Sequence, residues 1–194
     1  MSPRKEARSV ALVRFDRVDL GLVSEMASVL GESYPFLRFL VLSEALDLPN
    51  ARTRRVANLQ YRAEDFTPAL EKSQGLAGSD LEVGLTAVDL YVPDLNFVFG
   101  LASPIQGVAI VSTHRLEASF YGLPTNRSLL LRRALIESAH ELGHLLGLGH
   151  CRDRRCVMFF SNSILDTDAK GYAMCPRCRI PADAQGRQTG TEPG

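Results

Sequence analysis

The segment from His140 to His150, with the sequence HELGHLLGLGH, constrains this chain more than any other. His140 and His144 are four residues apart, so on a helix of about 3.6 residues per turn both imidazoles project from one face. Gly147 follows, and glycine is the residue that most easily takes the left-handed turn past a helix end. Such a turn brings His150 back toward the other two rings. The spacing therefore predicts three histidines that converge at the end of a helix.

Three converging imidazoles are typical of a catalytic zinc site. Neutral imidazoles bind Zn²⁺ at about 2.0–2.1 Å, and three protein ligands leave the fourth position open for water. Glu141 is rotated by roughly 100° from His140 about the helix axis, close to the metal but not bound to it. We predict His140, His144 and His150 as ligands of a catalytic zinc and Glu141 as the catalytic residue. The alternative is an amphipathic helix that carries these side chains by chance, although three of the four histidines of the chain fall in this segment.

All four cysteines lie in the last quarter of the chain, at Cys151, Cys156, Cys175 and Cys178. Two pairs of thiolates supply the ligands of a closed, tetrahedral structural zinc site. Its binding free energy would become folding free energy for a segment with little core of its own. Two disulfides and a redox-active Cys-x-x-Cys are the alternatives. We predict a structural zinc here, and thus two zinc ions per chain.

Upstream, short strand patterns alternate with helical patterns, which predicts an α/β (α+β) fold with a mixed, mostly parallel twisted sheet. We expect helices from Asp19, over 64–73, and from Thr125 or Asn126 to Gly147, and an ambiguous loop and strand over 52–61. Strands are expected at 9–15, 36–42, 81–92, 97–102 and 107–112. We divide the chain into an N-terminal tail (1–8), the sheet with its active-site helix (9–149), a small irregular zinc-bound subdomain (150–180) and a disordered tail (181–194).

The charge balance limits the classes of partner. Lys plus Arg total 22 and Asp plus Glu total 22, whereas proteins that bind nucleic acid normally carry a basic excess, so we expect no nucleic-acid partner. No apolar stretch approaches the roughly 18 residues that span a bilayer. The apolar run Val10–Val13 ends at Arg14 and is too short for a secretory signal. We expect a cytoplasmic monomer without membrane association.

Together, the two sets of residues resemble the archaemetzincins, a branch of the metzincin metallopeptidases. The match comprises HExxHxxGxxH at His140–His150, followed at once by Cys-x₄-Cys-x-Met and later by Cys-x-x-Cys. The spacing between Met158 and Cys175 is one residue shorter than is usual in that family. The resemblance covers most of residues 9–180, and it implies that Met158 is the Met-turn residue, an apolar floor beneath the catalytic zinc. From the sequence alone, Met158 is a core residue, and both roles are compatible.

The resemblance implies hydrolysis of peptide bonds in a peptide or protein substrate. A zinc-bound water would give its proton to Glu141 as general base and attack the carbonyl. By analogy with metzincins, an edge strand at 107–112 would pair with an extended substrate, and Tyr172 and His114 are candidates for a second oxyanion donor. The alternative is a zinc-binding or peptide-binding module with little or no hydrolytic activity. Glu141 favours the enzyme, since a scaffold needs no carboxylate at that position.

Overall fold

The computed structural model describes residues 6–50 and 59–187, and its centre is a five-stranded sheet. Neighbouring strands are parallel except for the antiparallel pair of β6 and β7. In register, Leu12 of β1 lies between Val41 of β2 and Val83 of β4. The mixed, mostly parallel sheet predicted from the sequence is confirmed. Across the sheet the order is β2 (Leu37–Leu46), β1 (Arg8–Phe15), β4 (Leu81–Thr86), β7 (Val108–Ser112) and β6 (Gly100–Ser103).

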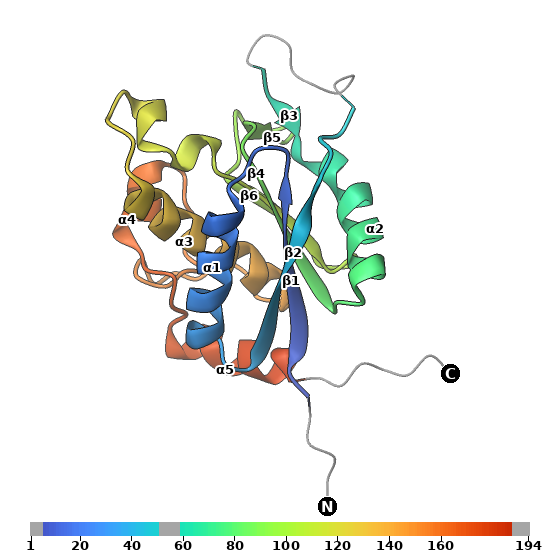
Figure 1. Cartoon of the computed structure of the whole chain (residues 1–194). Coiled ribbons are helices and arrows are strands. Elements are labelled where there is room, and N and C mark those ends of the chain that lie inside the picture. Colours follow the sequence, from blue (N-terminus) through green and yellow to red (C-terminus); the bar gives the residue numbers. More distant parts are fainter. Residues whose placement is uncertain (1–5, 51–58, 188–194) are drawn as a thin grey trace, which may run out of the picture.

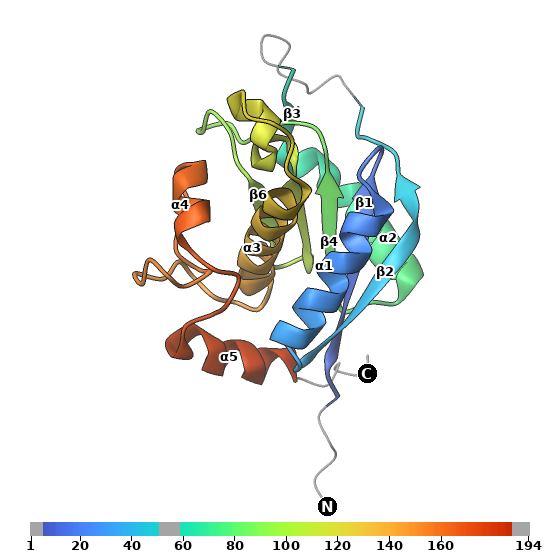
Figure 2. The ribbon, with the colours of Figure 1, turned by 60° about the vertical axis from the view of Figure 1, so that its left-hand side comes forward.

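Helices cover both faces of this sheet (Figure 1). α1 (Leu20–Ser33) and α3 (Arg127–Leu145) pack on one face, and α2 (Thr67–Ala77) packs on the other. After α3, the chain forms α4 (Ile164–Ala169), which lies beside α3, and α5 (Pro176–Gly186), which lies below α1 in Figure 2. Among the residues that the structure describes, no helix is long and apolar enough to cross a membrane.

Smaller elements connect these parts. β3 (Tyr61–Arg62) and β5 (Leu90–Tyr91) pair as a separate two-stranded sheet. Within residues 59–187, short 3₁₀ turns lie at Ala63–Phe66, His114–Leu116 and Ala118–Tyr121.

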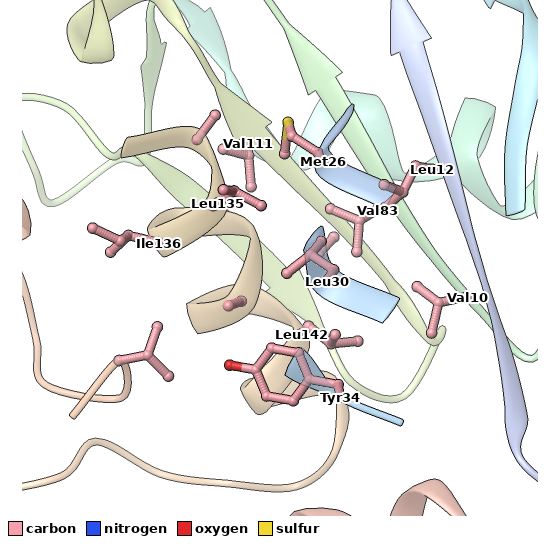
Figure 3. Close-up of a cluster of buried hydrophobic side chains, with 14 of the residues drawn as sticks. Val10, Leu12, Met26, Leu30, Tyr34, Val83, Val111, Leu135, Ile136 and Leu142 are labelled. Atoms are coloured by element: carbon pink, nitrogen blue, oxygen red, sulfur yellow. The ribbon is translucent and has the colours of Figure 1, made fainter. Parts of the chain in front are cut away.

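The main core lies between the sheet and the pair α1 and α3 (Figure 3). α1 begins after Asp19, whose carboxylate accepts hydrogen bonds from the backbone N–H groups of Gly21 and Leu22, as an N-cap should. Met26 and Leu30 are four residues apart and therefore face the sheet together. Around them pack the buried side chains of both helices and of the central strands, among them Val10, Leu12, Val83, Val111, Leu135 and Leu142.

On the other face, a second core lies under α2. Phe15 and Phe66 meet edge to face, with ring centroids 4.9 Å apart, and Leu70 packs beside them. Gly84 of β4 makes this close approach feasible, because a Cβ there would lie 2.7 Å from Leu70 Cδ2 and 2.9 Å from Phe15 Cε2. The sheet is thus buried between two apolar layers, which agrees with the apolar run Val10–Val13 of β1 and with the burial of every residue of β4.

The structure corrects the prediction of the edge strand. β7 lies between β4 and β6, so the edge strand is β6 and not residues 107–112. β6 joins β7 through a tight hairpin that ends at Gly107, where φ is +73°. The predicted strand 81–92 is interrupted after Thr86, and the predicted strand 97–102 begins only at Gly100.

The predicted C-terminal tail also differs. α5 continues through Pro181 to Gly186, so the first residues assigned to the tail are helical. The composition concealed this helix, because few of its side chains are apolar. It is held by Ala182, which is fully buried, and by Gly186, where a Cβ would lie 3.0 Å from Leu37 Cδ2. Residues 188–194, 1–5 and 51–58 lie outside the described residues, and with them most of the ambiguous segment 52–61.

Candidate active site and metal centres

The last turns of α3 carry the first two histidines. Asn126 caps the start of this helix by accepting a hydrogen bond from Leu129 N at 3.0 Å, as the sequence predicts. Past the helix end, Gly147 has a φ of +80°, and Leu148 N donates to Gly143 O at 2.9 Å. This turn reverses the chain.

The turn brings His150 against the other two rings. Its ring centroid lies 5.4 Å from that of His140 and 4.9 Å from that of His144. One nitrogen of each ring lies within 4.8 Å of the others. The structure therefore brings together the three histidines that the spacing selected. We call them the three-histidine cluster.

The hydrogen bonds of these rings fit a metal centre. Nδ1 of His140 lies 2.8 Å from Val157 O, and Nδ1 of His144 lies 2.8 Å from Leu148 O. A carbonyl only accepts, so each Nδ1 carries the proton and each Nε2 keeps its lone pair. The two Nε2 atoms nevertheless lie 3.1 Å apart. Two lone pairs this close repel each other unless a cation lies between them, and zinc ligands at tetrahedral angles are about 3.3–3.4 Å apart.

Burial keeps the rings neutral, as metal ligands must be. Burial, followed by the charge of the nearby Lys170, lowers the pKa of His140 to about 3. Burial also lowers the pKa of His144 and of the more exposed His150. His150 packs on the ring of Phe160, with centroids 4.8 Å apart.

Glu141 lies beside these histidines and is almost fully buried. A Cβ at Gly100 of β6 would lie 2.7 Å from Glu141 Oε1, so this glycine makes the space that the carboxylate occupies. Burial, followed by the charge of Glu137, raises the pKa of Glu141 to about 8, while Lys170 and a hydrogen bond with the backbone of Ala102 act in the opposite direction.

Two cavities meet at this site. One of about 210 Å³ and one of about 590 Å³ are both lined by His140, Glu141, Gly100 and Phe160. The larger cavity also reaches His144, His150 and the edge strand β6. Tyr172 and His114, the candidates for a second oxyanion donor, line neither cavity.

Met158 packs beneath the helix that carries the histidines. It is completely buried, and a Cβ at Gly143 would overlap its sulfur atom. Gly143 lies between Glu141 and His144, so the absence of a side chain there lets Met158 approach this turn of α3. The position agrees with the core role that the sequence predicts.

A buried polar network behind the site was missed by sequence reasoning. Glu137, one helical turn before Glu141, accepts hydrogen bonds at Oε1 from Thr167 at 2.8 Å and Ser161 at 3.4 Å. Lys170 Nζ lies 3.7 Å from the same oxygen and is fully buried. Burial raises the pKa of Glu137 and lowers that of Lys170. The only signal in the sequence is the spacing of Glu137 and Glu141, which places both carboxylates on one face of a helix.

The four cysteines form a second cluster, which we call the four-cysteine cluster. The sulfur atoms of Cys151, Cys156, Cys175 and Cys178 lie within 4.8 Å of one another, and all four thiols are free. Cys151 Sγ and Cys175 Sγ are 3.8 Å apart, and Cys175 N donates to Cys156 Sγ at 3.3 Å. Four thiols around one point are the donor set of a structural zinc site, and the cluster could hold a metal ion.

With this fold and these two clusters described, comparison with known proteins defines the class. Residues 58–181 match peptidase family M54. Over 119 residues, the chain is 51% identical to the archaemetzincin of Pyrococcus furiosus, and this aligned part covers 61% of the chain and 62% of that protein. The aligned part is therefore less than two thirds of the length of this curated relative.

Solved structures extend the match over most of the chain. The crystal structure of archaemetzincin from Methanopyrus kandleri has a TM-score of 0.80 at 36% identity, and it covers 95% of this chain and 98% of that one. A zinc-dependent peptidase from Methanocorpusculum labreanum also has a TM-score of 0.80, at 29% identity, with 89% and 99% covered. The chain belongs to peptidase family M54.

Proposed function

We propose that this chain is a zinc-dependent peptidase, with His140, His144 and His150 as the ligands of a catalytic zinc and Glu141 as the general base. The observation that carries this proposal is the pair of Nε2 atoms 3.1 Å apart, each with its Nδ1 bound to a backbone carbonyl. A cation bound between the rings would remove the repulsion between these two lone pairs. The buried carboxylate of Glu141 lines the same cavities.

When bound at the three histidines, zinc would act as a Lewis acid that lowers the pKa of water and polarises a carbonyl. Glu141 then takes a proton from the attacking water and returns it to the leaving amine. Without zinc, burial raises the pKa of this carboxyl to about 8, and the positive charge of a bound zinc would lower it toward the range in which the carboxylate accepts a proton near neutral pH. Gly100 supports this role, because only a residue without a side chain leaves room for the carboxylate.

The edge strand β6 is the element on which we expect the substrate to lie. Gly100, Leu101 and Ala102 line the larger cavity next to the histidines. One edge of β6 pairs with β7, and the other has no partner strand within the described part of the sheet. An extended peptide can therefore add to this edge by backbone hydrogen bonds.

The other roles in this proposal follow from position. Met158 would be the Met-turn residue, and the four-cysteine cluster would hold a second, structural zinc, which gives two ions per chain. The domain division into a sheet part and a zinc-bound C-terminal part follows from these two sites. A monomeric state and a cytoplasmic location stay predictions.

The experiment that tests the proposal compares the wild-type chain with Glu141→Gln on a peptide library, with zinc content measured in parallel. We expect the variant to retain zinc and to lose cleavage by a factor of about 10²–10⁴, the usual contribution of a general base. Glu71→Gln, the same change at an exposed position on α2, is the matched control and should cleave like the wild type. Zinc binding without cleavage by any of the three proteins would instead support the binding module.

A further inference from the structure

The side chain of Lys170 lies behind the three-histidine cluster and is completely buried. Its ammonium donates hydrogen bonds to two backbone carbonyls on either side of Met158, Val157 O at 3.0 Å and Phe159 O at 2.8 Å. Its charge is balanced by Glu137, whose Oε1 lies 3.7 Å away. Burial removes the hydration of an ammonium, so this placement is costly unless its donors are satisfied. The carbonyls of Val157 and Phe159 accept hydrogen bonds from two of these donors.

One of these carbonyls has a second donor. Nδ1 of His140 lies 2.8 Å from Val157 O, the oxygen that also accepts from Lys170. A carbonyl oxygen has two lone pairs and can accept both hydrogen bonds. The partner of Nδ1 determines which nitrogen of a histidine carries the proton and how the ring is oriented. The orientation of the Val157 carbonyl therefore controls the direction of Nε2 of His140.

The backbone around Lys170 is attached to the same helix that carries His140. Arg132 Nη2 donates to the carbonyls of Asp168 and Lys170, each at 3.0 Å. Arg133 makes two hydrogen bonds to the carboxylate of Asp168, at 2.8 Å and 2.7 Å. Both arginines belong to α3. These bonds fix the backbone of Lys170 relative to α3, and its side chain extends from this fixed position to Val157 O.

We propose that Lys170 is a positioning residue of the metal centre: it holds the Val157 carbonyl against Nδ1 of His140 and so keeps Nε2 directed at the metal. This inference rests on the proposed function for the zinc site itself. Lys170 lines neither of the two cavities, and it acts through Val157 and His140. A purely structural lysine would stabilise the C-terminal segment without changing the state of the His140 ring.

The test compares Lys170→Met with the matched control Thr167→Val in the full chain. Thr167 donates to the same oxygen of Glu137, so its loss perturbs the network but leaves both carbonyl contacts of Lys170 in place. Zinc affinity is measured by competition with a chelator, with the four-cysteine cluster as internal reference. Lys170→Met should weaken zinc at the three-histidine cluster by about 10–100-fold, as is typical for groups that orient a ligand. Thr167→Val should leave it nearly unchanged.

A second measurement needs no metal at the histidines. Nitrogen-15 NMR of the imidazoles reports which nitrogen of His140 is protonated. In the wild type and in Thr167→Val we expect the Nδ1–H form, and in Lys170→Met a mixture of the two forms. An unchanged ring and unchanged zinc affinity in folded Lys170→Met would overturn the inference.

Lys170→Met leaves Glu137 buried without its cation, which can prevent folding. The double variant Lys170→Met/Glu137→Gln removes this unpaired charge at similar volume, and it should show the same loss of zinc affinity and the same mixed ring. Wild-type affinity in the folded double variant would contradict the proposal. If the wild type itself binds no zinc at the histidines, the proposed function fails, and the NMR measurement still decides the role of Lys170.

Discussion

The three-histidine and four-cysteine clusters are neighbours along the chain, yet the fold prepares them in different ways. His140 and His144 stand on the 19-residue helix α3, whose inner face is buried against the sheet. Cys151 and Cys156 lie before the 6-residue helix α4, whereas Cys175 and Cys178 lie at the start of α5. The first site stands on a long buried helix, whereas the second lies in a segment of short elements.

This difference indicates what each metal would do for stability. A rigid helix holds its ligands in place whether or not a metal is bound, so metal binding there adds function. A segment built from turns and short helices would gain part of its structure from metal–ligand bonds, so metal binding there would add stability. We therefore expect a substitution in the three-histidine cluster to lower activity more than stability, and a substitution in the four-cysteine cluster to lower the stability of the fold.

The largest effect is expected for Cys156→Ser, which removes a buried thiol of the four-cysteine cluster. Structural zinc sites contribute several kcal/mol or more to folding, and we expect thermal unfolding to begin about 10 °C lower. Hydrogen exchange should show loss of protection over 150–187 and retained protection in the sheet. Ser28→Ala, a change at an exposed position on α1, serves as the control. Unchanged protection over 150–187 would mean that this segment folds without the metal.

His150→Ala is the matching change at the other cluster. We expect cleavage to fall on the order of 10³-fold, because the metal loses a ligand and its geometry. The midpoint of thermal unfolding should stay close to that of the wild type, since His150 is exposed and lies outside the core. Calorimetry on the variant measures this. A large drop in the unfolding temperature would mean that the three-histidine cluster also stabilises the fold, which contradicts the difference proposed between the two clusters.

Gly143→Ala tests the contact between α3 and the segment that links the clusters. The added Cβ would overlap the sulfur of Met158, which is completely buried and has little room to move. Overpacking of this kind typically costs about 1–3 kcal/mol. Chemical denaturation measures the loss. Gly75→Ala on α2, where a Cβ meets nothing within 4 Å, is the control and should not destabilise the chain. Met158→Ala in the Gly143→Ala background should recover part of the loss.

The smallest effect concerns the sheet, away from both clusters. Burial raises the pKa of Glu82 on β4 to about 7, although Ser73 acts in the opposite direction. The folded chain then holds this proton more tightly than the unfolded chain, so stability falls as pH rises from about 4.5 to 7. Glu82→Gln should be about 2 kcal/mol more stable at pH 8 and nearly equal to the wild type at pH 5. Denaturant unfolding at the two pH values measures this difference.

The pH dependence also separates the sheet from the metal sites. Acid protonates histidines and thiolates and so would release metal bound at either cluster, whereas protonation of Glu82 favours the folded sheet. If Glu82→Gln showed the same pH dependence as the wild type, the destabilisation at high pH would have another origin.

Sequence reasoning located the clusters because their signals are local. The i, i+4 spacing of His140 and His144 and the glycine at 147 are properties of one helix and its end. Strand order is not local, and this is why residues 107–112 were assigned to the edge that β6 occupies. Sequence reasoning missed Gly100 and Lys170 because their roles also depend on contacts between distant parts of the chain. Gly100 matters because Glu141, from another element, lies 2.7 Å from the position of its absent Cβ, and Lys170 meets Glu137 across 33 residues of chain.

His150 and Cys151 are consecutive residues, one in each cluster. A single peptide unit is stiff and holds the two Cα atoms about 3.8 Å apart. A displacement of Cys151 therefore also displaces His150. A thiol reagent or oxidant that dislodged Cys151 would pull on the most exposed histidine first. Loss of catalysis would then come before any loss of the fold.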